Sequence, residues 1–124
     1  MVLVDTSVWV RFLSNREPYA GGLDELLSRD EVAGHEMVYG ELLVGDRGGR
    51  VRLLSIYGQM TQAKAVPHAD VVEFARVRRL LGRGIGWIDV HLLASTIAAG
   101  LQLWTADARL AAVAAELDVA YRAA

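Results

Sequence analysis

Four acidic side chains could act together if the fold brings them to one place: Asp5, Glu41, Asp89 and Asp107. Carboxylates gathered at one edge of a sheet repel one another strongly unless a cation joins them. A set of oxygen ligands without histidine or cysteine selects a hard divalent ion, Mg²⁺ or Mn²⁺. Such ions serve phosphodiester hydrolysis because they activate a water and stabilise charge on the phosphate and the leaving oxygen. This chemistry requires that the surrounding elements deliver the four acids together.

Asp5 closes the first element of the chain. Residues 2–4 form a short unbroken apolar run, which predicts a strand buried on both faces at the centre of a parallel sheet. Because a buried strand does not tolerate a charge, Asp5 marks its carboxyl end, where open α/β sheets place their ligand sites. Thr6 and Ser7 then offer hydroxyl caps for a helix predicted over residues 8–13.

Asp107 repeats the setting of Asp5. It follows a predicted strand over residues 101–104, and Thr105 supplies the hydroxyl between strand and acid. Taken alone, Asp107 is better explained as the N-cap of a last helix over residues 107–117. Two parallel strands that end in the same way nevertheless place both acids on one edge of the sheet.

Glu41 lies on a predicted helix over residues 35–44, where its neighbours three and four positions away are Met37, Val38 and Val44. This spacing places the carboxylate within an apolar face. Gly40 beside it suggests the close approach of another segment. The alternative is a peripheral glutamate that extends from the edge of the face into solvent.

Asp89 lies in the first turn of a helix predicted over residues 88–99, which is apolar nearly all round and therefore buried. Acids are favoured at that position by the helix dipole, and this explanation is a good one by itself. The apolar surroundings weaken it. His91 lies about 200° round the helix from Asp89 and faces away from it. We expect His35, His68 and His91 to be structural or exposed.

The remaining pattern alternates short strands with helices, which predicts a three-layer α/β/α domain over residues 1–124 with a central, mainly parallel sheet of four to five strands. The other expected elements are strands over residues 32–33, 63–66 and 119–121 and helices over residues 23–27, 50–60 and 68–81.

Composition narrows the class of protein. The absence of cysteine excludes disulfides, zinc–thiolate sites and thiol catalysis. No apolar run approaches the roughly 18 residues of a membrane span, and the N-terminus lacks the pattern of a signal peptide, so we expect a cytoplasmic protein. The net charge of −2 conceals a basic middle: residues 47–84 carry 8 basic and 2 acidic side chains. Such a segment can attract a polyanion, although solvated helix faces explain it as well.

The motifs around these acids resemble those of the PIN domain family. They run from Val2 to Trp9, through the isolated Glu41 and the segment 89–94, to Thr105-Ala106-Asp107. The context of Asp89, Gly86-Trp87-Ile88, is most similar to the VapC toxins of bacterial toxin–antitoxin pairs. No single motif is specific, but their order and spacing are fairly specific, and the resemblance covers essentially the whole chain.

The resemblance implies an endoribonuclease that depends on Mg²⁺ or Mn²⁺ and is neutralised by a VapB-type antitoxin, whose C-terminal segment covers the active site. Carried over by position, the metal-site acids are Asp5, Glu41, Asp89 and Asp107. Ser7 is implied as a supporting hydroxyl, with Thr105 in the same role. The resemblance also implies a homodimer and a hetero-oligomer with the antitoxin. The alternative is a catalytically inactive PIN-like module that binds RNA or a protein.

Two groups of arginines are candidates for contacts to an RNA substrate. Arg76, Arg79 and Arg83 are spaced to form one basic stripe on the predicted helix over residues 68–81. A second group follows the Glu41 helix and consists of Arg47, Arg50 and Arg52. Phosphate contact would explain either group. A solvated helix face explains the first almost as well, and contact with the antitoxin could use the second.

Overall fold

The computed structural model describes residues 1–123 of the chain. In this range the elements follow in the order β1 (Val2–Val4), α1 (Thr6–Leu13), α2 (Tyr19–Ser28), β2 (Val32–Ala33), α3 (Glu36–Val44), α4 (Val51–Gln59), α5 (His68–Val77), α6 (Trp87–Ala99), β3 (Gln102–Trp104) and α7 (Ala108–Glu116). Most element ends lie within two residues of the predicted ones. The exceptions are α2, which is longer than expected, and α5, which is shorter.

The sheet has the order β2-β1-β3, and both pairings are parallel. The apolar run after Met1 therefore forms the central strand, as predicted. Val4 at the end of β1 lies opposite Trp104 at the end of β3, so the two strands finish side by side. The residues that follow them, Asp5 and Thr105, consequently start from the same edge of the sheet.

The prediction of four to five strands is wrong, because the described residues form three. The two expected outer strands meet the sheet only through single bridges, Gly34 to Gln62 and Leu103 to Ala120. At the first bridge the chain approaches so closely that a Cβ on Gly34 would overlap the Gln62 side chain. Pro67 soon ends that segment, since proline has no N–H to donate to a ladder.

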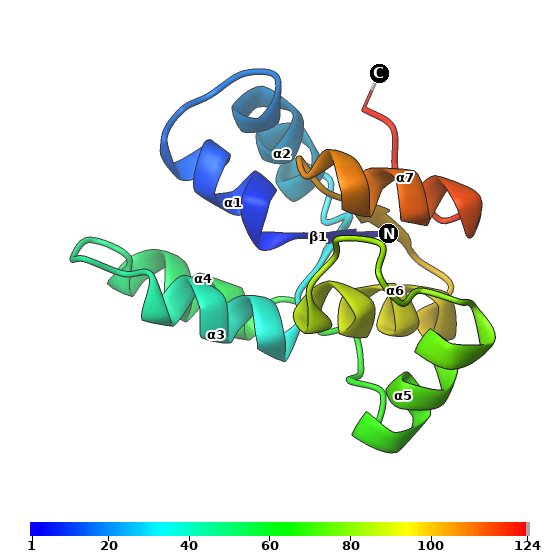
Figure 1. Cartoon of the computed structure of the whole chain (residues 1–124). Coiled ribbons are helices and arrows are strands. Elements are labelled where there is room, and N and C mark those ends of the chain that lie inside the picture. Colours follow the sequence, from blue (N-terminus) through cyan, green and yellow to red (C-terminus); the bar gives the residue numbers. More distant parts are fainter. Residues whose placement is uncertain (124) are drawn as a thin grey trace.

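Helices cover both faces of the sheet. In Figure 1, α1, α2 and α7 lie on one side of β1 and α3 to α6 lie on the other, which confirms the predicted three-layer arrangement. The core between the layers contains Leu3 and Val4, both fully buried. Trp9 of α1 packs edge-on against the ring of Tyr57 in α4, with centroids 5.4 Å apart. No helix in residues 1–123 is long and apolar enough to cross a membrane.

His35 fixes the start of α3, the helix that carries Glu41. Its Nδ1 accepts the N–H of Met37, so its Nε2–H is free to donate to Ser95 Oγ 2.9 Å away in α6. Its own N–H donates to the hydroxyl of Tyr57. Burial lowers the pKa of His35, in keeping with an imidazole that must stay neutral to cap the helix. The expected structural role of His35 follows from these bonds.

Candidate active site at the carboxyl edge of the sheet

Asp5 is the buried centre of the candidate site, with 5% of its surface exposed. Its N–H donates to the carbonyl of Trp104, which extends the β1–β3 pairing by one step. Ser7 and Thr105 both donate their hydroxyls to Asp5 Oδ2, at 2.7 and 2.8 Å. Among the described residues no donor reaches Oδ1, so one carboxylate oxygen is held in place while the other stays free.

Helix α1 begins at Thr6, earlier than predicted, and Asp5 occupies the N-cap position without a side-chain capping bond. The expectation that Thr6 and Ser7 cap the helix is therefore wrong. Ser7 instead joins the two strand ends, because its Oγ also accepts the N–H of Ala106. The hydroxyls of Thr6 and Ser7 therefore donate to the carboxylates of Glu41 and Asp5 rather than cap the helix.

Asp107 is exposed and caps α7. Its Oδ1 accepts the N–H groups of Arg109 and Leu110, both at 2.9 Å. Thr105 Oγ1 in turn accepts the N–H of Asp107, so the turn from β3 to α7 is tied at both ends. The capping role predicted for Asp107 is confirmed. Its Oδ2 remains available to bind a ligand.

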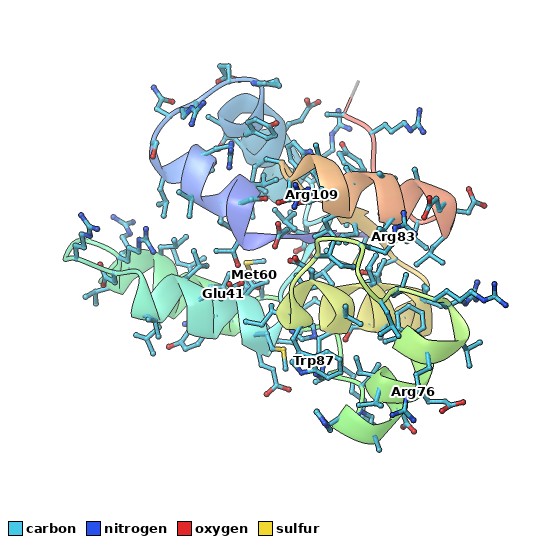
Figure 2. The ribbon with its side chains drawn as sticks, viewed as in Figure 1. Glu41, Met60, Arg76, Arg83, Trp87 and Arg109 are labelled. Carbon is cyan, nitrogen blue, oxygen red and sulfur yellow. The ribbon has the colours of Figure 1, made fainter. Side chains whose placement is uncertain are left out.

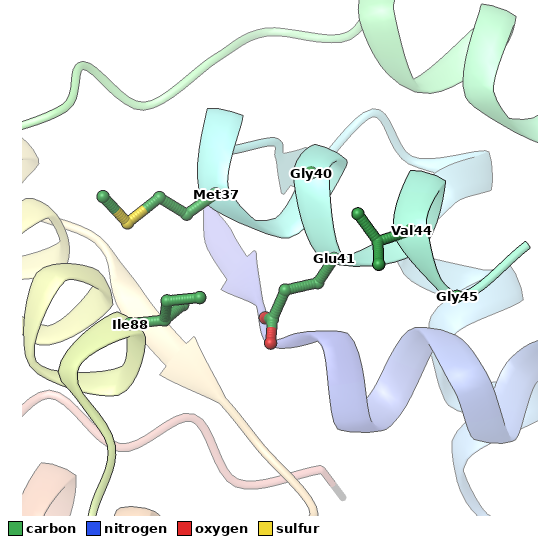
Figure 3. A pocket seen from close by; sticks show the side chains of 6 residues that line it. All are labelled: Met37, Gly40, Glu41, Val44, Gly45 and Ile88. Carbon is green, nitrogen blue, oxygen red and sulfur yellow. The ribbon is translucent and has the colours of Figure 1, made fainter.

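Glu41 reaches the same edge from α3. Figure 3 shows its carboxylate at the junction of β1 and α1, and there Thr6 Oγ1 donates to Oε1 at 2.7 Å. The side chain is exposed and borders an open groove of about 600 Å³, whose apolar walls include Met37, Val44 and Ile88. The idea that Gly40 admits another segment is wrong, since a Cβ there would meet no atom within 4 Å.

Asp89 lies in the first turn of α6, where its Oδ2 accepts the N–H of Gly86 at 2.9 Å. Burial is the main reason why the pKa of Asp89 is raised above the ordinary 3.8. The hydrogen bond from Gly86 opposes this rise, while the negative charges of Asp5, Asp107 and Glu41 add to it. Asp89 thus senses all three of the other acids, as expected if they face a common space.

The four acids offer the donor chemistry of a hard divalent ion. All are oxygen ligands, Asp5 has a free oxygen, and the repulsion felt by Asp89 is of the kind that a cation relieves. Within residues 1–123, however, no three acidic or histidine side chains are close enough to enclose a metal ion as they stand. The residues fit such an ion in the type of donor atom and in their place at one edge of the sheet.

The predicted basic stripe does not exist as one helix face. Helix α5 ends at Val77, and Arg79 has left the helix with a left-handed φ of 54°. The guanidinium of Arg83 pairs with both carboxylate oxygens of Glu116 in α7, at 2.8 and 2.9 Å. Of this group, Arg76 and Arg79 remain exposed without a carboxylate within 4.0 Å in the described chain.

The second arginine group lies at the turn between α3 and α4. Arg50 is partly buried, and its Nη1 donates to the carbonyl of Leu42 at 2.9 Å, so it supports the end of α3. Arg47 and Arg52 are exposed. This group is thus divided between one structural cation and two that can meet a ligand.

Two residues near the acids were missed from the sequence. Thr6, assigned only a capping role, bonds Glu41. Arg109 stands in the first turn of α7, and its guanidinium lies against Gly84, where a Cβ would come within 2.8 Å of Nη1. Figure 2 labels it beside the start of α7, and it labels Arg83, which belongs to the segment before α6, nearer the end of α7. A basic residue in a first turn opposes the helix dipole, and this was the available signal.

Comparison with known proteins agrees with the fold. Residues 2–116 match the family model of the PIN domain. The chain is 40% identical over 121 residues to proteins named Ribonuclease VapC32 from two strains of Mycobacterium tuberculosis, covering 97% of this chain and 95% of each relative. Among solved structures it resembles PAE2754 from Pyrobaculum aerophilum, with a TM-score of 0.58, 18% identity, and coverage of 90% of this chain and 82% of that one.

The chain therefore belongs to the PIN domain family. Within that family it is of the VapC type, given its identity to the two mycobacterial relatives over nearly their full length. The structural neighbour supports the fold alone. The resemblance drawn from the motifs around the four acids is confirmed.

Proposed function

We propose that this protein is the toxin of a type II toxin–antitoxin pair and acts as an endoribonuclease that depends on Mg²⁺ or Mn²⁺. The observation that carries this proposal is Asp5, buried at the end of the central strand with one oxygen held by two hydroxyls and the other free. The identity to proteins named ribonuclease supports the same conclusion. A catalytically inactive binding module is disfavoured because all four acids are retained.

In the proposed reaction an RNA phosphodiester is hydrolysed by water. Asp5, Glu41 and Asp89 would hold the metal ion, and Asp107 would act in its outer shell or on a second ion. A bound divalent ion supplies a more acidic water and stabilises charge on the phosphate and the leaving oxygen. Ser7 and Thr105 keep the Asp5 carboxylate in one orientation, so its free oxygen need not be ordered during the reaction.

RNA would approach over cations that are not already engaged by a carboxylate or carbonyl of the chain. Among such cations the candidates are the guanidinium groups of Arg47, Arg52, Arg76, Arg79 and Arg109. Each phosphate contact would add affinity that weakens with salt. Arg50 and Arg83, also candidates from the sequence, are better placed to support the fold.

A VapB-type antitoxin is the proposed partner, and the groove beside Glu41 suits it. Apolar side chains from a partner segment would cover Met37, Val44 and Ile88 and would also shield the Glu41 carboxylate from RNA. Val44 is 86% exposed and so offers a large apolar surface to such a segment. The homodimer, the complex with the antitoxin and the cytoplasmic location belong to the same proposal.

The test is cleavage of end-labelled single-stranded and structured RNAs by the purified protein without antitoxin. We expect cleavage with Mg²⁺ or Mn²⁺ and none with EDTA, and a matched variant of an exposed acid away from the site, Asp24→Asn, should cleave like the wild type. Equal cleavage in EDTA would reject the metal-dependent reaction. No cleavage with either metal would favour the binding module.

A further inference from the structure

Glu41 needs a constraint that its own helix does not provide. Its carboxylate is exposed at the end of a flexible side chain. Fixing a glutamate side chain in one rotamer costs more conformational entropy than fixing most other side chains. The groove walls beside it, Met37, Val44 and Ile88, are apolar and offer no hydrogen bond. In the described part of the chain the one hydrogen bond to this carboxylate comes from Thr6.

Thr6 is well placed to provide that constraint. It starts α1 directly after Asp5, and its β-branched side chain has few rotamers, so the hydroxyl is pre-oriented. Its Oγ1 crosses to Glu41 on α3, 35 residues further along the chain, at 2.7 Å. Thr6 is joined to Asp5 by one peptide bond and to Glu41 by one hydrogen bond, so it sets the position of the Glu41 carboxylate relative to Asp5.

We infer that Thr6 is a positioning residue that holds the Glu41 carboxylate near the other acids of the site, Asp5, Asp89 and Asp107. It thereby strengthens the binding of a divalent ion by these side chains. The inference rests on the proposed function only in treating Glu41 as a metal ligand. Thr6 touches neither metal nor RNA in this role. It acts through Glu41, as the hydroxyls of Ser7 and Thr105 act through Asp5.

The test measures Mn²⁺ binding without RNA, by calorimetry or by the spin resonance of free Mn²⁺. Thr6→Val removes the hydroxyl and keeps the shape, and we expect Mn²⁺ binding about 10- to 100-fold weaker, the usual effect of losing a group that orients a ligand. Thr6→Ser keeps the hydroxyl and should recover most of the affinity. Ser14→Ala, which removes a hydroxyl bonded to Val10 at the other end of α1, should bind like the wild type.

A double-mutant cycle isolates the hydrogen bond. In the Glu41→Ala background, Thr6→Val should weaken Mn²⁺ binding much less than it does in the wild type, because the carboxylate that accepts the Thr6 hydroxyl is gone. Thermal melting of each metal-free variant checks that it is folded. Wild-type affinity in Thr6→Val, equal weakness in Thr6→Ser, or an undiminished effect in the Glu41→Ala background would each overturn the inference.

RNA cleavage measured on the same variants separates this inference from the proposed function. If the wild type cleaves RNA and Thr6→Val does so with unchanged metal dependence, the inference fails and the nuclease stands. If the wild type binds Mn²⁺ in a Thr6-dependent way but does not cleave RNA, the nuclease fails and the positioning role stands.

Discussion

Asp5 and Asp107 occupy equivalent places in the fold and are used differently. Each follows a parallel strand of the sheet and stands at the N-cap of the next helix. Asp107 is exposed, and one of its carboxylate oxygens accepts two N–H groups of α7. Asp5 is buried, makes no capping bond, and receives the hydroxyls of Ser7 and Thr105.

The difference separates an acid that is bonded within its own helix from one that is held by hydroxyls of other segments, although both stand in the same local pattern. A capping bond satisfies a carboxylate within its own helix, so removing the acid costs helix stability. The hydroxyls around Asp5 come from two segments and hold its carboxylate in place, and its negative charge, like that of Glu41, acts on Asp89. We therefore expect function to depend most on Asp5 and local stability to depend most on Asp107.

The largest expected effect is on RNA cleavage. Asp5→Asn should lower the cleavage rate about 10³-fold, equivalent to about 4 kcal/mol, because it removes the central negative ligand for the metal ion. Asp107→Asn should lower it only about 10-fold. Single-turnover rates at saturating Mn²⁺ measure both effects. An equal loss of rate in the two variants would contradict the expectation that cleavage depends more on Asp5 than on Asp107.

A smaller effect should appear in stability. Asp107→Ala removes the cap of α7 and should lower the free energy of unfolding by about 1 kcal/mol, whereas Asp107→Asn keeps a capping oxygen and should cost little. Asp5→Asn loses no capping bond. Urea unfolding in EDTA gives these values, and an Asp107→Ala variant as stable as the wild type would show that the capping bonds contribute nothing.

The finest distinction concerns the pKa of Asp89. The charge of Asp5 raises it more than the charge of Asp107, so in metal-free protein Asp5→Asn should lower this pKa further than Asp107→Asn does. Because the folded pKa lies above 3.8, the free energy of unfolding falls as the pH rises through that interval, and this fall should be smaller in Asp5→Asn. Carboxyl NMR titration measures the pKa, and the opposite order would contradict the shared space.

The sequence was sufficient for the features that depend on burial and chain order. The apolar run before Asp5 had to be a central strand, and a helix as apolar as α6 had to be buried; residues 90–96 are all buried. The parallel order of β1 and β3 then brought Asp5 and Thr105 to one edge. These predictions held because they follow from desolvation, which a short segment reveals locally.

Features that depend on contacts between distant segments escaped prediction. The length of the outer strands depends on how the segments after α4 and α7 meet the sheet, and only single bridges form. The end of α5 is set by Arg79 in a left-handed conformation rather than by the glycines that follow. The Arg83–Glu116 pair and the Thr6–Glu41 bond join residues more than 30 positions apart, a separation at which sequence spacing carries no information.

The shape of the sheet also limits how another chain can attach to it. Beyond β2 the chain itself supplies Thr61 and Ala63 as hydrogen-bond partners for Gly34, and beyond β3 it supplies Val119 and Tyr121 for Leu103. Both borders of this narrow sheet are therefore already occupied where an incoming strand would pair. A partner or a second copy that paired with the sheet at Gly34 or Leu103 would first have to displace these segments.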